Sequence, residues 1–209
     1  MAQSSFSGPV RSANGLVLGN ESGIGVKVGD AVTQDFGWRD ITGQVDTRLG
    51  ATNPTWTQIG SGPFYAYAFS VNDECWVNFH IPHDIVPGSD IHLHCHWLTS
   101  GTSTNSVKWE WYYSFAKGFN QAAFNTTGTL ITAEEAASGV AYQHMVTETA
   151  AITISALTEP DGFLLTRMRR VTNGGSENLD TVFVITTDVH YQSTNMPTSG
   201  KAPDFYALS

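Results

Sequence analysis

The sequence predicts an all-β protein: a jelly-roll-like antiparallel β-sandwich with extended N-terminal and C-terminal arms. Three observations lead to this fold class. The 209 residues are 41% hydrophobic and only 14% charged, and the chain is rich in the aromatic residues and threonines that favour strands. Glycines and prolines divide it into short runs and mark turns. Several runs alternate apolar and polar residues, as strands with one buried face do.

The expected strands follow from these boundaries, and the alternation is cleanest from Cys75 to Ile81 and from Trp109 to Phe115. Segment 133–138 is the one helical prediction, about one turn long, with Thr132 as N-cap. No internal repeat occurs, which favours a sandwich over a propeller. The strands are expected at 55–60, 63–71, 74–81, 90–99, 106–116, 126–132, 142–149, 151–156, 162–171 and 180–192.

Three regions are expected along the chain: an arm over 1–36, a sandwich over 37–192 and a second arm over 193–209. Two short apolar runs within 15–29 could each form a strand, but neither can bury its apolar side alone. The first arm is therefore either a segment that lies on a neighbouring chain or a flexible tail. The predicted core comprises Val77, Phe79, Ile81, Leu93, Trp97, Trp109, Trp111, Phe115, Leu165, Phe183 and Val189.

Three histidines are the most informative feature of the sequence. His92, His94 and His96 alternate with apolar residues in the expected strand 90–99, so their imidazoles project from one face of it. His190 and Glu110 occupy polar faces of later strands and are expected to join them. Such a cluster either binds a metal, with His94, His96 and His190 as candidate ligands, or forms a polar surface at a subunit contact.

A cupin-like metalloprotein is one alternative for this cluster. The spacing from Gly88 to His94 and His96 matches the first half of the cupin metal motif, but Ser100 and Gly101 stand where its glutamate belongs. The second half of that motif does not appear around His190. We therefore favour neutral imidazoles at a subunit contact or around a structural ion, and we expect no cofactor and no catalytic residue.

The segment before these histidines predicts a turn. Pro87 and Gly88 suit a type II turn, and Asp84, which follows His83, can accept backbone N–H bonds.

The charge excludes some functions. With a net charge of −9 and ten Lys and Arg residues, broad binding to nucleic acid is not expected. No signal peptide or membrane span is recognised, so we expect synthesis in a cytosol and no membrane partner. Cys75 and Cys95 lie on apolar strand faces and are expected to be buried thiols, with a disulfide as the less favoured alternative.

The chain shows no nucleophile elbow, P-loop or dinucleotide fingerprint, and we expect it not to be an enzyme. Exposed aromatic residues could instead recognise a glycan on a receptor. Because Trp109, Trp111 and Tyr113 share a face that resembles core, a glycan groove would have to use Tyr112 and Trp76.

Several segments together are similar to a family of tailed-bacteriophage virion structural proteins, and the resemblance spans nearly the whole chain. These segments are Gly25-Val-Lys-Val28, Phe36-Gly-Trp-Arg-Asp-Ile41, Ile81-Pro-His-Asp84, Pro87-Gly-Ser-Asp90, His94-Cys-His-Trp97, Ala116-Lys-Gly-Phe119, His144-Met145, Asp188-Val-His-Tyr-Gln192 and Lys201-Ala-Pro-Asp-Phe205.

The resemblance implies a place in the virion, after synthesis in the bacterial host cytoplasm. It implies a capsid decoration protein, cement protein or head fibre, or a neck or tail appendage, and it assigns no catalytic residue. The partners would be the major capsid protein or connector and tail proteins. Virion jelly rolls are commonly trimeric, so we also expect a homotrimer.

Overall fold

The computed structural model describes residues 16–17, 27–28, 36–48 and 52–206. The chain divides into two compact units, residues 1–37 and 38–209. Within the first unit, β1 (Leu16–Val17) and β2 (Lys27–Val28) form a two-stranded antiparallel ladder. Both apolar runs of the predicted N-terminal arm thus contain a strand. The rest of the arm up to residue 35 lies outside the described residues.

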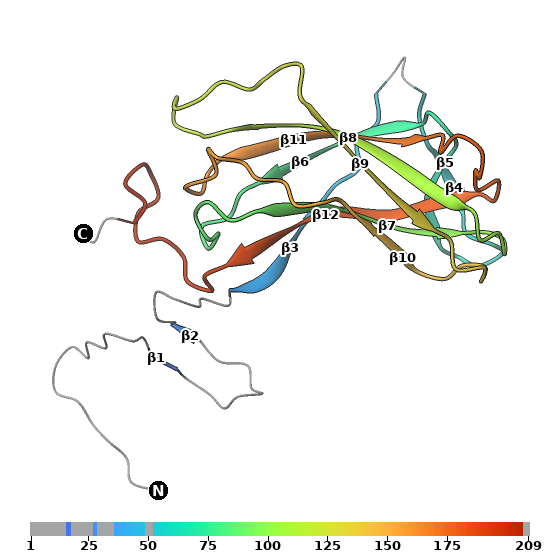
Figure 1. The fold of residues 1–209 in the computed structure, drawn as a ribbon, viewed down its shortest axis with the longest axis horizontal. Coiled ribbons are helices and arrows are strands. Elements are labelled where there is room, and N and C mark those ends of the chain that lie inside the picture. The colour runs from blue at the N-terminus through green and yellow to red at the C-terminus, as the bar shows by residue number, and fades with distance from the viewer. Residues whose placement is uncertain (1–15, 18–26, 29–35, 49–51, 207–209) are drawn as a thin grey trace, which may run out of the picture. The chain divides into compact units, whose positions relative to one another are not determined.

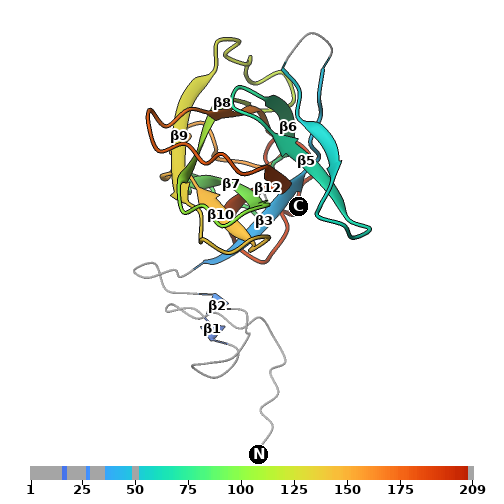
Figure 2. The same cartoon turned by 90° about the vertical axis from the view of Figure 1, so that its right-hand side faces the viewer.

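The second unit is an antiparallel β-sandwich of jelly-roll type (Figure 1 and Figure 2). A six-stranded sheet has the order β10-β7-β12-β5-β4, and β3 also pairs with β12. A four-stranded sheet has the order β6-β11-β8-β9. The strands are β3 (Gly37–Gly43), β4 (Thr55–Gln58), β5 (Tyr65–Phe69), β6 (Glu74–His80), β7 (Ile91–Thr99), β8 (Ser106–Ala116), β9 (Thr129–Ala136), β10 (Met145–Glu148), β11 (Phe163–Val171) and β12 (Val182–Ser193). The predicted antiparallel β-sandwich of jelly-roll type is confirmed.

The core lies between the two sheets and contains most of the predicted residues. Leu165 is the error: it is exposed, whereas its neighbour Leu164 is fully buried. In a strand, alternate side chains face the core, and the sequence Leu164-Leu165 does not show which of the two does so. The pairing of β11 with β6 and β8 turns Leu164 toward the core. Phe115 is only partly buried against the core. Phe183 is buried in a separate small cluster with Ala66 and Leu98.

The helix predicted at 133–138 is wrong, because residues 133–136 belong to β9. Lys108 pairs with Glu134 in a ladder along β8, and Ile131 and Ala133 pack against the core. A one-turn helix is marginal alone, so the ladder prevails. The strand predicted at 151–156 is reduced to an isolated bridge between Ile91 and Ile152. None of the described residues forms a helix that could cross a membrane.

The C-terminal segment differs from the extended arm predicted over 193–209. Its described part, 194–206, consists of turns and bends after β12. Phe205 is 1% exposed, and its ring centroid lies 5.6 Å from that of His83 and 6.0 Å from that of Phe119. Burial of this aromatic ring holds the segment against the sandwich.

The predicted turn is present in a modified form. The Ser89 amide donates to the Val86 carbonyl at 3.1 Å, and Gly88 has a φ of 75°, as a type II turn requires at its third residue. The Asp84 carbonyl accepts a hydrogen bond from the Thr194 amide at 2.7 Å, and the Asp84 carboxylate accepts hydrogen bonds from side chains. Its donors are Arg39 at 2.8 Å, Tyr191 at 3.0 Å and Ser193 at 2.6 Å, so Asp84 ties the turn to β3 and β12.

Candidate functional site: histidines and carboxylates on the six-stranded sheet

The three histidines of β7 lie on the outer face of the six-stranded sheet. The alternating Leu93, Cys95 and Trp97 are fully buried in the core. Strand β7 lies between β10 and β12, and the register places Glu148 of β10 and Asp188 of β12 on either side of His94. Residues far apart in sequence therefore meet on one face of three adjacent strands.

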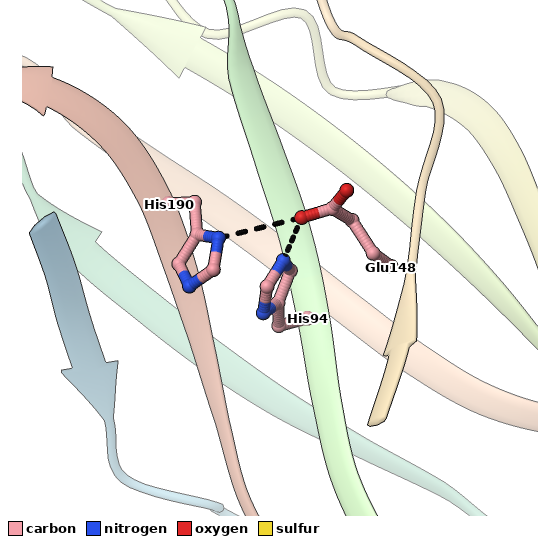
Figure 3. Close-up of side chains that lie close together, drawn as sticks. All are labelled: His94, Glu148 and His190. Carbon is pink, nitrogen blue, oxygen red and sulfur yellow. Dashed lines mark hydrogen bonds and ion pairs between the residues drawn. The ribbon is translucent and has the colours of Figure 1, made fainter. Parts of the chain in front are cut away.

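Glu148 links His94 of β7 to His190 of β12 (Figure 3). Its Oε2 atom contacts Nε2 of His94 and lies 3.3 Å from Nδ1 of His190. The Nε2 atom of His190 is in turn paired with Asp40 of β3. Four strands, β3, β12, β7 and β10, thus contribute to a continuous chain of imidazoles and carboxylates.

A second branch of the cluster runs through His96. Its Nε2 atom lies 3.0 Å from Oδ2 of Asp188, and its Nδ1 atom lies 2.9 Å from Nε2 of His144. His92 stands at the edge of the cluster, where its Nδ1 atom donates to the Thr149 carbonyl at 3.0 Å. The Trp38 ring packs against His92 in a T-shaped contact, with the two ring centroids 5.4 Å apart.

Burial sets the electrostatics of the cluster. It lowers the pKa of the His94 imidazole, although the hydrogen bond to Glu148 opposes this shift. Burial alone would raise the pKa of Glu148, but the hydrogen bond to His94 and the neighbouring imidazoles lower it overall. Near neutral pH these shifts favour a neutral imidazole beside an ionised carboxylate.

The structure brings together four of the five predicted site residues, His92, His94, His96 and His190. The fifth, Glu110, is misplaced: β8 belongs to the four-stranded sheet, and Glu110 pairs there with Arg167 at 2.7 Å. The carboxylates of the cluster come from other strands. Asp188 lies two residues before His190 and so on the same face of its strand, but no sequence signal places Asp40, His144 and Glu148 beside the histidines.

The cluster has the chemistry of a cation site. Three overlapping groups of His, Asp and Glu side chains bring their ligand atoms within 4.8 Å of one another. They are His94, Glu148 and His190; His94, His96 and Asp188; and Asp40, Asp188 and His190.

A second feature lies on the four-stranded sheet. Trp76 of β6 and Tyr112 of β8, the two residues predicted for a glycan groove, line one open groove of ≈580 Å³. Arg167 lies 4.6 Å from the centre of the Tyr112 ring, and Arg48 lies 4.7 Å from that of Trp76. The residues 124–128 form part of its wall.

No protein-family model and no curated protein matches this sequence. Among solved structures, the chain is similar to a xylan-binding module, CBM15, with 10% identity over 77% of this chain and 94% of the module and a TM-score of 0.35. The CBM35 module of Abf62 from Cellvibrio japonicus has 12% identity over 75% and 98% of the two chains and a TM-score of 0.35. The enzymatically active domain of tailspike protein 4 of bacteriophage CBA120 has 8% identity over 74% of this chain and 19% of its own, with a TM-score of 0.29. Similarity this weak carries no functional information, so the proposals below depend on the side chains of this protein.

Proposed function

We propose that this chain is a non-catalytic structural component of a tailed-bacteriophage virion, which assembles with copies of itself and with capsid, connector or tail proteins. The assignment to a tailed-bacteriophage virion depends on the sequence segments from Gly25 to Phe205 that resemble virion structural proteins. The observation that carries an assembly role is an exposed aromatic hairpin formed by β4 and β5.

Three large aromatic side chains are exposed on this hairpin. Trp56, Phe64 and Tyr65 are 59%, 71% and 50% exposed, and the rings of Trp56 and Tyr65 stack at 6.4 Å. The turn between the two strands projects from the sandwich, in teal in Figure 2. Several aromatic side chains exposed on one hairpin are typical of a protein contact.

Burial of these three side chains would favour association. If each aromatic side chain offers roughly 200 Å², the three together expose roughly 350 Å², and their burial would contribute about 9 kcal/mol before the costs of association. Among the described strands, β4 also ends its sheet. An edge strand has free backbone groups that a second copy can pair with. Both features favour self-association through this hairpin.

The test is the mass of the full chain in solution. We expect the wild type to sediment as a homo-oligomer, a trimer in the proposed form, and the triple variant Trp56→Ser, Phe64→Ser and Tyr65→Ser to sediment as a monomer with an unchanged circular dichroism spectrum. Leu179→Ser is the control, because Leu179 is 89% exposed and lies outside the hairpin. A monomeric wild type, or a triple variant with wild-type mass, would contradict the assembly role.

A second candidate function is recognition of a surface glycan, and the groove with Trp76 and Tyr112 favours it. Aromatic rings beside arginine, asparagine and threonine side chains can stack on sugar rings and hydrogen-bond to their hydroxyls. A glycan array tests this function. Binding that is lost in Trp76→Ala and Tyr112→Ala, and retained in Trp38→Ala on the other sheet, would support it. An array without any bound glycan would reject it.

A further inference from the structure

Two buried polar atoms in the histidine cluster have no hydrogen-bond partner. They are Nδ1 of His94 and Oδ1 of Asp188, and they lie 3.6 Å apart. The two side chains are only 5% and 7% exposed. Buried polar atoms are normally satisfied, and an unsatisfied one costs about 1–3 kcal/mol. Two such atoms facing each other indicate a missing partner.

A cation would satisfy both atoms. The Nε2 atom of His94 contacts the carboxylate of Glu148, which accepts a hydrogen bond, so the proton of a neutral His94 lies on Nε2. Its Nδ1 atom then presents a lone pair, as Oδ1 of Asp188 also does. A positive ion between these two lone pairs would be attracted to both of them.

The spacing of these atoms suits a transition-metal ion. Ligand atoms about 2.0–2.1 Å from a tetrahedral ion lie about 3.4 Å from one another. The separation of 3.6 Å between His94 Nδ1 and Asp188 Oδ1 is close to this value, and His96 Nε2 lies 3.0 Å from the other oxygen of Asp188. We propose that His94 Nδ1, His96 Nε2 and the Asp188 carboxylate hold one divalent transition-metal ion at this position.

The surrounding contacts match those of known metal sites. A histidine ligand commonly uses its second ring nitrogen for a hydrogen bond that fixes the ring, often to a carboxylate. His94 uses Nε2 for Glu148, and His96 uses Nδ1 for His144. His190 and Asp40 extend this outer set. Both ligand imidazoles are therefore already oriented toward Asp188.

The ligand chemistry selects the class of ion. Two imidazole nitrogens and a carboxylate suit Zn²⁺ and neighbouring divalent ions such as Co²⁺ and Ni²⁺, whereas Ca²⁺ and Mg²⁺ prefer sets of oxygen ligands. The ligands come from β7 and β12, and Glu148 adds β10. The ion would therefore lock three adjacent strands of the six-stranded sheet together. This role extends the proposed virion function and does not depend on it.

The experiment uses Zn²⁺ as the probe and the full chain produced without a histidine tag. After chelator treatment, isothermal titration with ZnCl₂ and elemental analysis are expected to give one tightly bound ion per chain and a raised melting temperature. His96→Gln and Asp188→Asn should each weaken binding more than about 100-fold, and Glu148→Gln about 10- to 100-fold. His80→Gln is the control, since His80 lies on β6 of the four-stranded sheet, outside the cluster, and this variant should bind zinc as the wild type does.

X-ray absorption of the zinc-loaded wild type keeps the proposal testable if a variant fails to fold. A first shell of nitrogen and oxygen with scattering from two imidazoles is expected. Absence of stoichiometric zinc in the wild type, or a first shell without imidazole, would overturn the proposal. Retention of binding in His96→Gln together with its loss in His190→Gln would also overturn the ligand set, because it would place the ion beside Glu148.

Discussion

Arg170 joins the two sheets of the sandwich, and its replacement is the sharpest test of how the fold is held together. Its side chain, on β11 of the four-stranded sheet, is 4% exposed. The Nη1 atom donates at 2.7 Å to the carbonyl of Phe69, at the end of β5 in the six-stranded sheet. The Nη2 atom donates to the Asn178 carbonyl and pairs with Glu177 at 2.9 Å.

Arg170→Met keeps an unbranched apolar side chain, about as long as the aliphatic part of arginine, while removing all three polar interactions. The Phe69 and Asn178 carbonyls would lose their donor, and Glu177 would lose its counter-charge. Breaking a buried pair by removing one partner costs about 3–5 kcal/mol, a large share of the about 5–15 kcal/mol that stabilises a typical domain. We therefore expect the free energy of unfolding to fall by about 3–5 kcal/mol.

Urea denaturation followed by tryptophan fluorescence measures this loss. Arg169→Met is the control, because Arg169 lies one position away on the same strand and its Nη2 atom bonds only to exposed Asn72, at 2.6 Å. We expect it to cost less than about 1 kcal/mol. If the Arg170→Met variant unfolds within 1 kcal/mol of the wild type by the same roughly two-state transition, Arg170 does not hold the sheets together.

The two buried thiols give the remaining predictions. Burial raises the pKa of Cys75 from 9.0 to about 12, so its contribution to stability is full below pH 9 and is lost as the pH rises toward 12. Between these pH values the free energy of unfolding should fall by up to about 1.4 kcal/mol per pH unit. Urea denaturation at several pH values measures this slope, which should be smaller in Cys75→Ala. Equal slopes for the two proteins would refute this cause. Because Cys75 and Cys95 are both fully buried, thiol reagents at pH 8 should label the native protein only as fast as it opens, and immediate labelling would contradict their burial.

The sequence predicted the strands best where burial leaves a clear local pattern. The boundaries of 106–116 agree with β8, and β6 and β7 differ from their predicted ranges by a single residue at an end. Segment 133–138 was mistaken for a helix because a short run of Ala and Glu has no strand pattern of its own. Its conformation depends on pairing with β8, which no local signal encodes.

The histidine cluster was predictable only along its own strand. The alternation in 90–99 places three imidazoles on one face, and it does so correctly. The carboxylates depend on which strands lie beside β7, and these are β10 and β12 instead of the next strand in sequence. Glu110 was therefore chosen where Glu148 and Asp188 stand. A single sequence contains the periodicity of a strand, but not its neighbours in the sheet.

Protein mass spectrometry of phage particles purified on a density gradient tests the proposed virion role most directly. The account predicts peptides from this chain in gradient-purified particles, at a fixed ratio to the major capsid protein that persists through repeated purification. Peptides found only in the infected-cell lysate, and absent from the particles, would contradict it.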